Sequence, residues 1–234
     1  MLRPYLLCCK NLSGTLLTAL KDKFTAVPMP ESDSLPFPVS CHPDMLIFTA
    51  GDIIVTGKDY YTKNKALLDS FDMTVVTADE TQGEKYPSDV LFNAFALGNT
   101  LFANQKYVSA KIKELFPEQI NVRQGYAACS TCRVDEKHMI TADTGIAAAA
   151  EKLGVSVLLI SEGHVEIERY SHGFIGGASF SDGENVYFFG NIKSHPDHKK
   201  ITDFIISAGK NCVSLSDEPL HDYGGAIIIK KYEK

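Results

Sequence analysis

The sequence predicts an α/β protein, a five-bladed α/β propeller built from repeated units of strand, strand, helix and strand. Three observations predict this fold. Apolar stretches of strand length alternate with amphipathic stretches of helical length, and the units recur at spacings of 39 to 48 residues. The two chain ends hold complementary parts of a single unit. The whole chain, residues 1–234, is expected to form one such domain.

The clearest unit begins at His42. Residues 45–49 are predicted as its first strand and residues 53–55 as its second, followed by a helix over 60–71 and a closing strand over 73–76. Similar units begin at residues 86, 125 and 173. Their predicted first strands cover residues 90–96, 128–134 and 176–180, and their predicted helices cover 106–116, 145–153 and a segment that has Pro196 in its first turn.

The fifth unit is split between the chain ends. It begins at His221, and only a strand over residues 225–230 follows before the C-terminus. The N-terminus supplies a strand over 5–9, a helix over 13–23 with Ser13 as N-cap, and a strand over 25–29. A ring of such units buries both faces of every small sheet, which an isolated unit cannot do. An open α/β sandwich with the same alternation of elements is the alternative.

The amino-acid composition argues against several classes of function. The chain has 44% hydrophobic and 22% charged residues and a formal net charge of -6. Lysine and arginine form no basic stripe, so nucleic-acid binding is not expected. No stretch approaches the roughly 20 apolar residues of a membrane span. No secretory signal is recognisable at the N-terminus. These features favour a cytoplasmic protein with reduced cysteines, in which Cys8, Cys9 and Cys212 pack as small apolar residues.

Several short motifs near the starts of the units resemble a known fold family. They are His42-Pro43-Asp44-Met45, Tyr86-Pro87-Ser88-Asp89, Gly125-Tyr126 with Cys129, Gly173-Phe174-Ile175-Gly176-Gly177 and Asp222-Tyr223-Gly224. With the repeat, they resemble the pentein fold of guanidino-group-modifying enzymes, and most closely an uncharacterised bacterial family of that fold. The fold also occurs in the ribosome anti-association factor of eukaryotes and archaea, which is not an enzyme.

The resemblance does not extend to the usual catalytic residues. Catalytic penteins are expected to carry a nucleophilic cysteine in the last unit and a histidine in the unit before it. Here residues 221–226 contain no cysteine, and Gly176-Gly177-Ala178-Ser179 stands where that histidine is expected. The resemblance therefore implies the fold, and it leaves guanidine hydrolysis by the usual arrangement unsupported.

The first strands of a propeller line its centre, so polar residues near their starts are the candidates for function. They are His42, Asp44, Asp89, Asn93, Cys129, Cys132, Ser179, His221 and Asp222. The hypothesis is that Cys129 attacks a substrate, His42 or His221 transfers the proton, and Asp44, Asp89 or Asp222 binds a cationic group. Asn93, Ser179, Gly176 and Gly177 are expected to contact the same ligand in a central pocket.

Structural explanations exist for several of these residues. Asp44, Asp89 and Asp222 are typical turn residues that bind backbone N–H groups. The glycine pair at 176 and 177 either permits close approach of strands or presents N–H groups to an anion. Cys129 and Cys132 form a C-x-x-C motif with no second pair in the sequence, so no metal and no cofactor are expected. In an extended segment, these two cysteines would face opposite sides.

Two functions remain open at this stage. The first is a cysteine-dependent hydrolase or transferase that acts on a small amidine-like, guanidine-like or other nitrogenous compound. The second is a non-catalytic binding module, with the same fold as the anti-association factor. The failure of the usual catalytic pattern favours the second, and the concentration of Cys, His and Asp residues near the strand starts favours the first.

Overall fold

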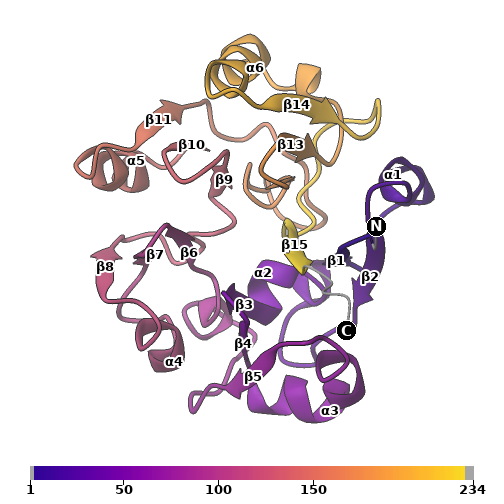
Figure 1. The fold of residues 1–234 in the computed structure, drawn as a ribbon, viewed down its shortest axis with the longest axis vertical. Coiled ribbons are helices and arrows are strands. Elements are labelled where there is room, and N and C mark those ends of the chain that lie inside the picture. The colour runs from indigo at the N-terminus through magenta and orange to yellow at the C-terminus, as the bar shows by residue number, and fades with distance from the viewer. Residues whose placement is uncertain (1–2, 230–234) are drawn as a thin grey trace.

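The computed structural model describes residues 3–229. It shows a mixed α/β fold with five three-stranded sheets that follow one another around the middle of the molecule (Figure 1). None of these sheets closes on itself. In each sheet the middle strand pairs antiparallel with the inner strand and parallel with the outer one. From inner to outer strand the sheets are β15 (Ala226–Ile229), β1 (Tyr5–Cys9) and β2 (Thr25–Met29); β3 (Ile47–Ala50), β4 (Ile53–Thr56) and β5 (Thr74–Thr77); β6 (Phe95–Leu97), β7 (Thr100–Ala103) and β8 (Glu118–Asn121); β9 (Thr131–Arg133), β10 (His138–Thr141) and β11 (Ser156–Leu159); and β12 (Ser179–Ser181), β13 (Asn185–Phe188) and β14 (Asn211–Ser214).

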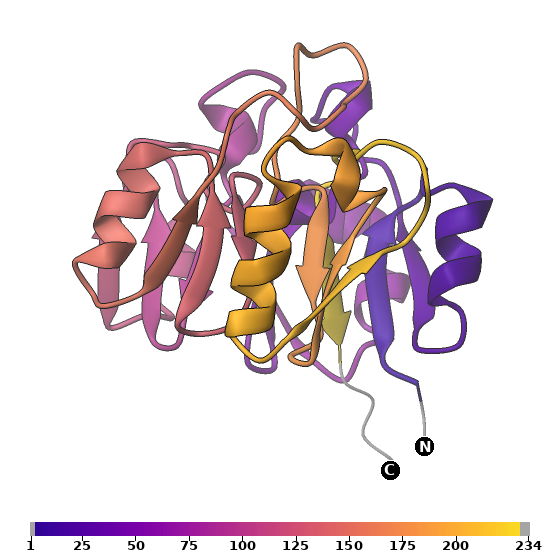
Figure 2. The same cartoon turned by 90° about the horizontal axis from the view of Figure 1, so that it is seen from above.

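The two ends of the chain build one sheet together. Strand β1 pairs antiparallel with β15, in a register that runs from Tyr5 opposite Ile229 to Cys8 opposite Ala226. The same β1 pairs in parallel with β2. Strands β1 and β15 lie side by side in both ribbon views (Figures 1 and 2). The predicted pairing of the chain ends is therefore confirmed. Lys230, the last residue of the predicted strand, lies outside the described residues.

A helix joins the middle strand of each sheet to its outer strand and lies on the periphery (Figure 1). Ser13 caps the first of these helices, as predicted, by accepting a hydrogen bond from the N–H of Leu16. The helix predicted over 106–116 is shorter, because residues 104–108 form a turn and Ser109 is the N-cap. Pro196 also lies outside the helix in which it was predicted, since that helix begins at His198. The five helices are α1 (Gly14–Leu20), α3 (Lys58–Leu68), α4 (Ala110–Lys113), α5 (Thr144–Glu151) and α6 (His198–Ser207).

Four predicted first strands begin later than the sequence suggested. The residues before them form tight turns or short helices, which include α2 (Pro43–Leu46) and the 3₁₀ helix η2 (Ser88–Val90). Local backbone bonds fix these turns: the N–H of Met45 donates to His42, that of Asn93 to Val90, and that of Thr131 to Ala128. Buried turns of this kind have the same apolar sequence pattern as strands, so periodicity could not separate the two. Two further 3₁₀ helices are η1 (Phe37–Val39) and η3 (Ile192–Ser194).

Five clusters of buried apolar side chains hold the sheets together, and each is shared between two successive sheets. One of them joins Leu7 of β1 to Met45 of α2 and to Ile54 of the next sheet. Burying such residues is the main favourable contribution to folding, about 25 cal/mol for each Å² of apolar surface. No helix within residues 3–229 is long and apolar enough to cross a membrane.

The β1 strand offers a test of the sheet that the chain ends share. Leu7 is 0% exposed and lies between this sheet and the next. We expect Leu7→Ala to lower the free energy of unfolding by about 2–5 kcal/mol, because it leaves a cavity in a core shared by both chain ends. Ile206 of α6 is 59% exposed, and Ile206→Ala should change stability by no more than about 0.5 kcal/mol. Urea unfolding of both variants measures the difference; equal effects would contradict the assignment of Leu7 to a shared core.

Candidate active site

The inner strands of all five sheets surround a cavity of about 500 Å³, which we call the central cavity. Its wall includes residues from β3, β6, β9, β12 and β15, together with Asp44 and Gly224 from the turns that precede two of these strands. The turns before the inner strands converge at one end of this cavity. Because each turn belongs to a different sheet, residues far apart in sequence meet there.

Cys129, Asp44 and Asn93 form a hydrogen-bonded group at this end. The Cys129 thiol donates to Oδ2 of Asp44, with 2.8 Å between the sulfur and the oxygen. Nδ2 of Asn93 donates to the same sulfur at 2.9 Å. Oδ1 of Asn93 accepts from the backbone N–H groups of Ala128 at 2.8 Å and Cys129 at 3.2 Å. Asn93 therefore fixes both the backbone and the sulfur atom of Cys129.

The surroundings of Cys129 keep its thiol protonated. The residue is 4% exposed, and burial raises the pKa of the thiol well above its ordinary value of 9.0. The nearby Asp44 and Asp222 add to the rise, while the hydrogen bond from Asn93 opposes it. A protonated thiol is also what the hydrogen bond to Asp44 requires, since a carboxylate can only accept.

Asp44 connects the thiol with the central cavity. Burial raises the pKa of its carboxyl group from 3.8 to about 6, although the hydrogen bonds from Cys129 and Asn93 favour the ionised form. Its Oδ1 atom is buried without a hydrogen-bond partner in the described part of the chain. A carboxylate oxygen left without a donor carries an energetic cost that a bound donor would remove.

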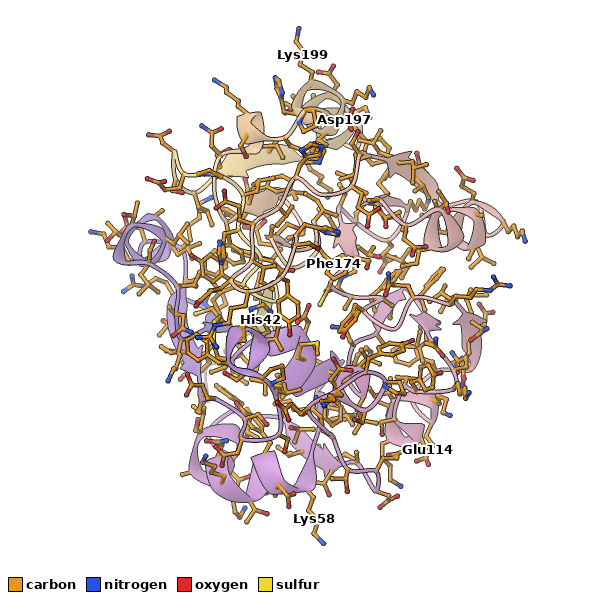
Figure 3. All side chains as sticks on the ribbon, turned by 180° about the vertical axis from the view of Figure 1, so that it is seen from behind. His42, Lys58, Glu114, Phe174, Asp197 and Lys199 are labelled. Carbon is orange, nitrogen blue, oxygen red and sulfur yellow. A yellow bond between two sulfur atoms is a disulfide. The ribbon has the colours of Figure 1, made fainter. Side chains whose placement is uncertain are left out.

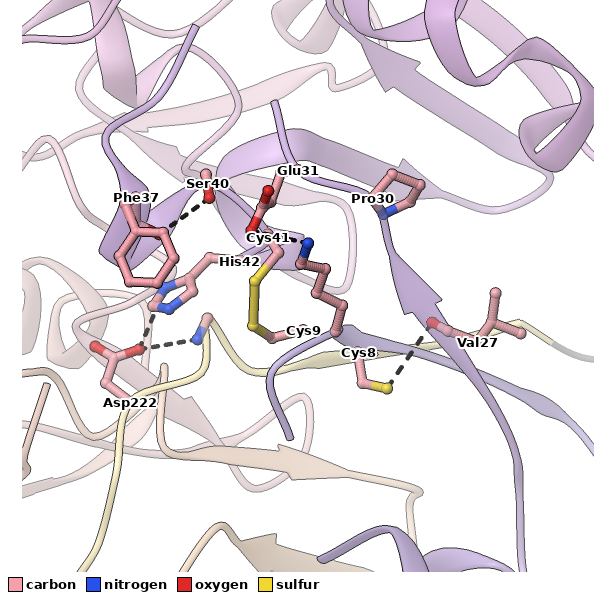
Figure 4. The surroundings of a disulfide bond; sticks show 12 residues. Cys8, Cys9, Val27, Pro30, Glu31, Phe37, Ser40, Cys41, His42 and Asp222 are labelled. Atoms are coloured by element: carbon pink, nitrogen blue, oxygen red, sulfur yellow. Dashed lines mark hydrogen bonds and ion pairs between the residues drawn. A yellow bond between two sulfur atoms is a disulfide. The ribbon is translucent and has the colours of Figure 1, made fainter. Parts of the chain in front are cut away.

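His42 and Asp222 lie beside this group, each 2% exposed. Nδ1 of His42 is 3.7 Å from Oδ1 of Asp222 (Figure 4). Burial lowers the pKa of His42 to about 3 and raises that of Asp222 to about 7, with Asp44 adding to the second shift. His42 is therefore neutral at neutral pH. Figure 3 shows His42 in the middle of the molecule, whereas Lys58 and Lys199 point outwards.

Asp222 is held by the backbone. Its Oδ1 accepts from the N–H of Gly224 and its Oδ2 from the N–H of Phe174, both at 2.9 Å. A Cβ atom on Gly177 would collide with this carboxyl group, and one on Gly224, where φ is +71°, would collide with His42. The predicted role of glycines in close approach applies here, and it also applies to Gly176, where a Cβ would meet three backbone carbonyls.

Asp89 lies farther from the thiol in the bonding network. Its Oδ2 accepts a hydrogen bond of 2.6 Å from the hydroxyl of Tyr126, and its Oδ1 is buried without a partner in the described residues. Burial raises the pKa of Asp89, against the hydrogen bond from Tyr126. Tyr126 stacks on Phe174 with 5.9 Å between the ring centroids. Asp89 is thus linked to the Asp222 loop through two aromatic rings.

Three of the predicted residues are placed differently. His221 lines a separate cavity with Glu166 and Tyr170, and its ring packs on Tyr223 at 4.6 Å. Ser179 lines the central cavity, but its hydroxyl donates to the carbonyl of Ile175 at 2.8 Å. Cys132 points away from the cavity into the core between two sheets.

Two features were missed. Arg133, on the same face of β9 as Thr131, lines the central cavity and was not among the predicted residues. Cys9 forms a disulfide with Cys41, the residue before His42, so the expectation that it packs as a free cysteine is wrong (Figure 4). The fold brings the Cα atoms of these cysteines to 5.0 Å, across 32 positions of sequence that no local pattern connects. Within residues 3–229 no three His, Cys, Asp or Glu side chains are grouped so as to hold a metal ion.

The raised pKa of Asp44 predicts how stability depends on pH. Below pH 3.8 the carboxyl group is protonated in both states, so its burial carries no ionisation cost. As the pH rises to about 6, the unfolded chain releases this proton more readily than the folded protein, and stability falls. The free energy of unfolding of the wild type, relative to Asp44→Asn, should therefore decrease between about pH 4 and pH 6 and stay level above that.

Urea unfolding at a series of pH values measures this difference. Asp69→Asn is the control of opposite sign, since Lys65 and Tyr61 lower the pKa of Asp69 at the surface. Its stabilising contribution should disappear as the pH falls below the ordinary carboxyl range. A difference between wild type and Asp44→Asn that does not change between pH 4 and pH 6 would contradict the buried, proton-binding state of Asp44.

Comparison with solved structures identifies the fold. Dimethylarginine dimethylaminohydrolase from Pseudomonas aeruginosa, in complex with citrulline, superposes with a TM-score of 0.56 at 6% identity, covering 93% of each chain. An amidinotransferase from Microseira wollei gives 0.59 at 9% identity, covering 98% of this chain and 95% of the other. The N-terminal domain of a cyanobacterial arginine dihydrolase gives 0.58 at 10% identity, covering 98% of each. This chain therefore has the pentein fold of guanidino-group-modifying enzymes.

Comparison by sequence assigns the chain to a family. A search of curated proteins finds no significant match. Residues 9–227 match one family, and that range includes Asp44, Asn93 and Cys129. The chain belongs to the family of unknown function DUF6873.

Proposed function

We propose that the protein is a cysteine-dependent hydrolase or transferase, with Cys129 as nucleophile, that acts on a small amidine-like, guanidine-like or related nitrogenous compound. One observation carries the proposal: beside the central cavity the Cys129 sulfur donates a hydrogen bond to Asp44 and accepts one from Asn93, two residues that precede the inner strands of two other sheets. We further propose that the five sheets are the blades of one propeller domain, which gives this group its rigid support.

Charge explains why a cationic substrate suits the site. Cys129, Asp44 and Asp222 are buried together, and this burial, with the two carboxyl groups adding to it, keeps the thiol in its protonated form. An amidinium or guanidinium next to Asp44 would place a positive charge against the sulfur and lower the pKa of the thiol. The free Oδ1 of Asp44 would accept an N–H of the bound cation. The nucleophile would then be activated only when the substrate is present.

The first half of the reaction follows from this geometry. The proton moves from the Cys129 sulfur to Oδ2 of Asp44, 2.8 Å away, as the sulfur attacks the amidinium carbon and an S–C bond forms. The adduct collapses when a C–N bond breaks, and the departing amine takes the proton from Asp44. A cationic thioimidate on Cys129 remains, and Asp44 is ionised again.

The second half regenerates the thiol. Water attacks the same carbon, a C–O bond forms, and Asp44 takes one proton from the water. The C–S bond then breaks, that proton passes from Asp44 to the sulfur, and the product leaves with the second proton of the water, which it releases to the solvent. In a transferase, an amine attacks in place of water. Neutral His42 and the backbone-bound Asp222 would orient the reacting group, and Asn93 would hold the sulfur in place. Asp89 and Ser179 are proposed as further ligand contacts.

The relatives in structure support the choice of substrate class. The proteins compared above include a dimethylarginine dimethylaminohydrolase, an amidinotransferase and an arginine dihydrolase. Identities between 6% and 10% show only that the fold is shared. The residue positions differ from the usual pattern, since the nucleophile proposed here belongs to the third unit rather than the last.

A binding module without catalysis is the second candidate, and one observation favours it. Cys129 is 4% exposed and its thiol is held in the protonated form, which is typical of a structural cysteine. In that case the central cavity and its polar end would hold a ligand without changing it.

Alkylation distinguishes the two candidates. We expect the cationic reagent 2-chloroacetamidine to modify Cys129 faster than Cys212, although Cys212 is the more exposed thiol. The neutral reagent iodoacetamide should show the opposite preference, because it does not offset the charge of Asp44. Peptide mass spectrometry after timed incubation gives both rates.

Matched variants complete the test. Cys129→Ala should abolish the amidine adduct at this position, and Cys212→Ser should leave it unchanged. Asp44→Asn should reduce the preference for the cationic reagent by about tenfold, since a paired charge contributes on the order of 1–2 kcal/mol. If Cys212 reacts first with both reagents and Cys129 stays unmodified in the folded protein, the enzyme proposal is wrong and the binding module is favoured.

A further inference from the structure

The central cavity contains one positively charged side chain, that of Arg133. Among the described residues that line the cavity, the other charged ones are acidic: Asp44, Asp135 and Glu136. Thr131 and Arg133 are two positions apart on β9, so their side chains are on the same face of the strand, about 6.6 Å apart along it. Both face the cavity, while Cys132 between them faces the core.

Neither of these two side chains has its polar group satisfied within the described residues. No hydrogen bond or ion pair joins the Arg133 guanidinium to any residue in the range 3–229 that the structure covers, and Asp44 acts on it through charge alone. The hydroxyl of Thr131, a residue 3% exposed, is buried without a partner in the same range. A buried hydroxyl group such as that of Thr131 is otherwise nearly always hydrogen-bonded in proteins.

Arg133 is an exposed residue on the cavity wall, and the protein around its guanidinium lowers the pKa of that group. Because no acidic side chain among the described residues is hydrogen-bonded or ion-paired to it, the guanidinium is available to an anion that enters the cavity. A carboxylate is the natural complement, because its two oxygens match the guanidinium with two parallel hydrogen bonds.

The rest of the wall restricts the ligand further. Asp44, Asp135 and Glu136 would repel a second negative charge. Much of the remaining surface is apolar and would hold a hydrocarbon group. A volume of about 500 Å³ is in the range of small-molecule sites. The apolar side chains of the wall include Ile47, Phe48, Leu97, Phe180 and Ile227.

We infer that the central cavity is a binding site for a small organic monocarboxylate, whose carboxylate pairs with Arg133 and the Thr131 hydroxyl while its hydrocarbon part lies against the inner strands. This site is separate from the thiol of Cys129 and does not depend on any reaction at it. The two are nevertheless connected, since Asp44 belongs to both.

Benzoate is a suitable probe because it joins one carboxylate to an apolar ring. Isothermal titration should show that the wild-type protein binds benzoate, and binds the neutral amide benzamide at least about tenfold more weakly, the effect of a charged hydrogen-bonded pair. Arg133→Gln should weaken benzoate binding by a similar factor. Arg123→Gln, which removes an exposed arginine outside the cavity, should bind benzoate as the wild type does. Phthalate, a dicarboxylate of similar shape, should bind more weakly than benzoate.

A measurement on the wild-type protein avoids dependence on the folding of a variant. Phenylglyoxal modifies accessible arginines, and benzoate should slow the modification of Arg133 but not of Arg123, as read by peptide mass spectrometry. Equal binding of benzoate and benzamide, unchanged binding by Arg133→Gln, or absence of both binding and protection at millimolar benzoate would overturn the inference. Because no step uses Cys129, Cys129→Ala should bind benzoate normally, so a failure of the enzyme proposal leaves this result unaffected.

Discussion

The pairing of β1 with β15 is the constraint on which the candidate site depends. It joins the C-terminal strand to the N-terminal sheet, and so places the loop with Asp222 and Gly224 against α2. The backbone N–H of Asp44 donates to the carbonyl of Gly224 at 3.3 Å, which links these two segments directly. Without that pairing, nothing would hold His42 next to Asp222, and the polar end of the central cavity would lack one side.

Electrostatics at this polar end is unbalanced. Two carboxyl groups and a thiol are buried within mutual influence, and their pKa values are all raised. The histidine beside them is neutral because burial lowers its pKa to about 3. The two carboxyl groups and the thiol therefore hold their protons instead of ionising beside a positive charge. Each proposed ligand would bring a charge opposite to that of the residue it contacts. A cation would neutralise Asp44 from the thiol side, and a carboxylate would neutralise Arg133 farther along the cavity.

The repeat could be predicted from the sequence because strand pairs, helices and turns leave local patterns. The complementary parts at the two chain ends could be recognised for the same reason, and β1 pairs with both β15 and β2 as this predicted. The turns before the inner strands could not be recognised, since residues such as Met45 and Val90 are as apolar as those of a strand. Asp44, Cys129 and Asn93 were among the residues predicted from the sequence, but the hydrogen bond by which Asn93 holds the Cys129 sulfur can be seen only in three dimensions. The Cys9–Cys41 disulfide and the exposure of Arg133 to the cavity depend on packing alone.

Gly224 has a consequence for how this protein can vary. Its backbone lies in the left-handed region, and the space that a side chain would need is occupied by the Cβ, Cγ and backbone Cα atoms of His42. Any other amino acid at this position would have to displace His42 together with its backbone and, through it, the contact with Asp222. A smaller side chain at position 42 would not make enough room, because the backbone itself is in the way. A homologue that has another residue at the place of Gly224 should therefore have a different path of the chain before β3, and this would mark members in which this part of the site has been remodelled.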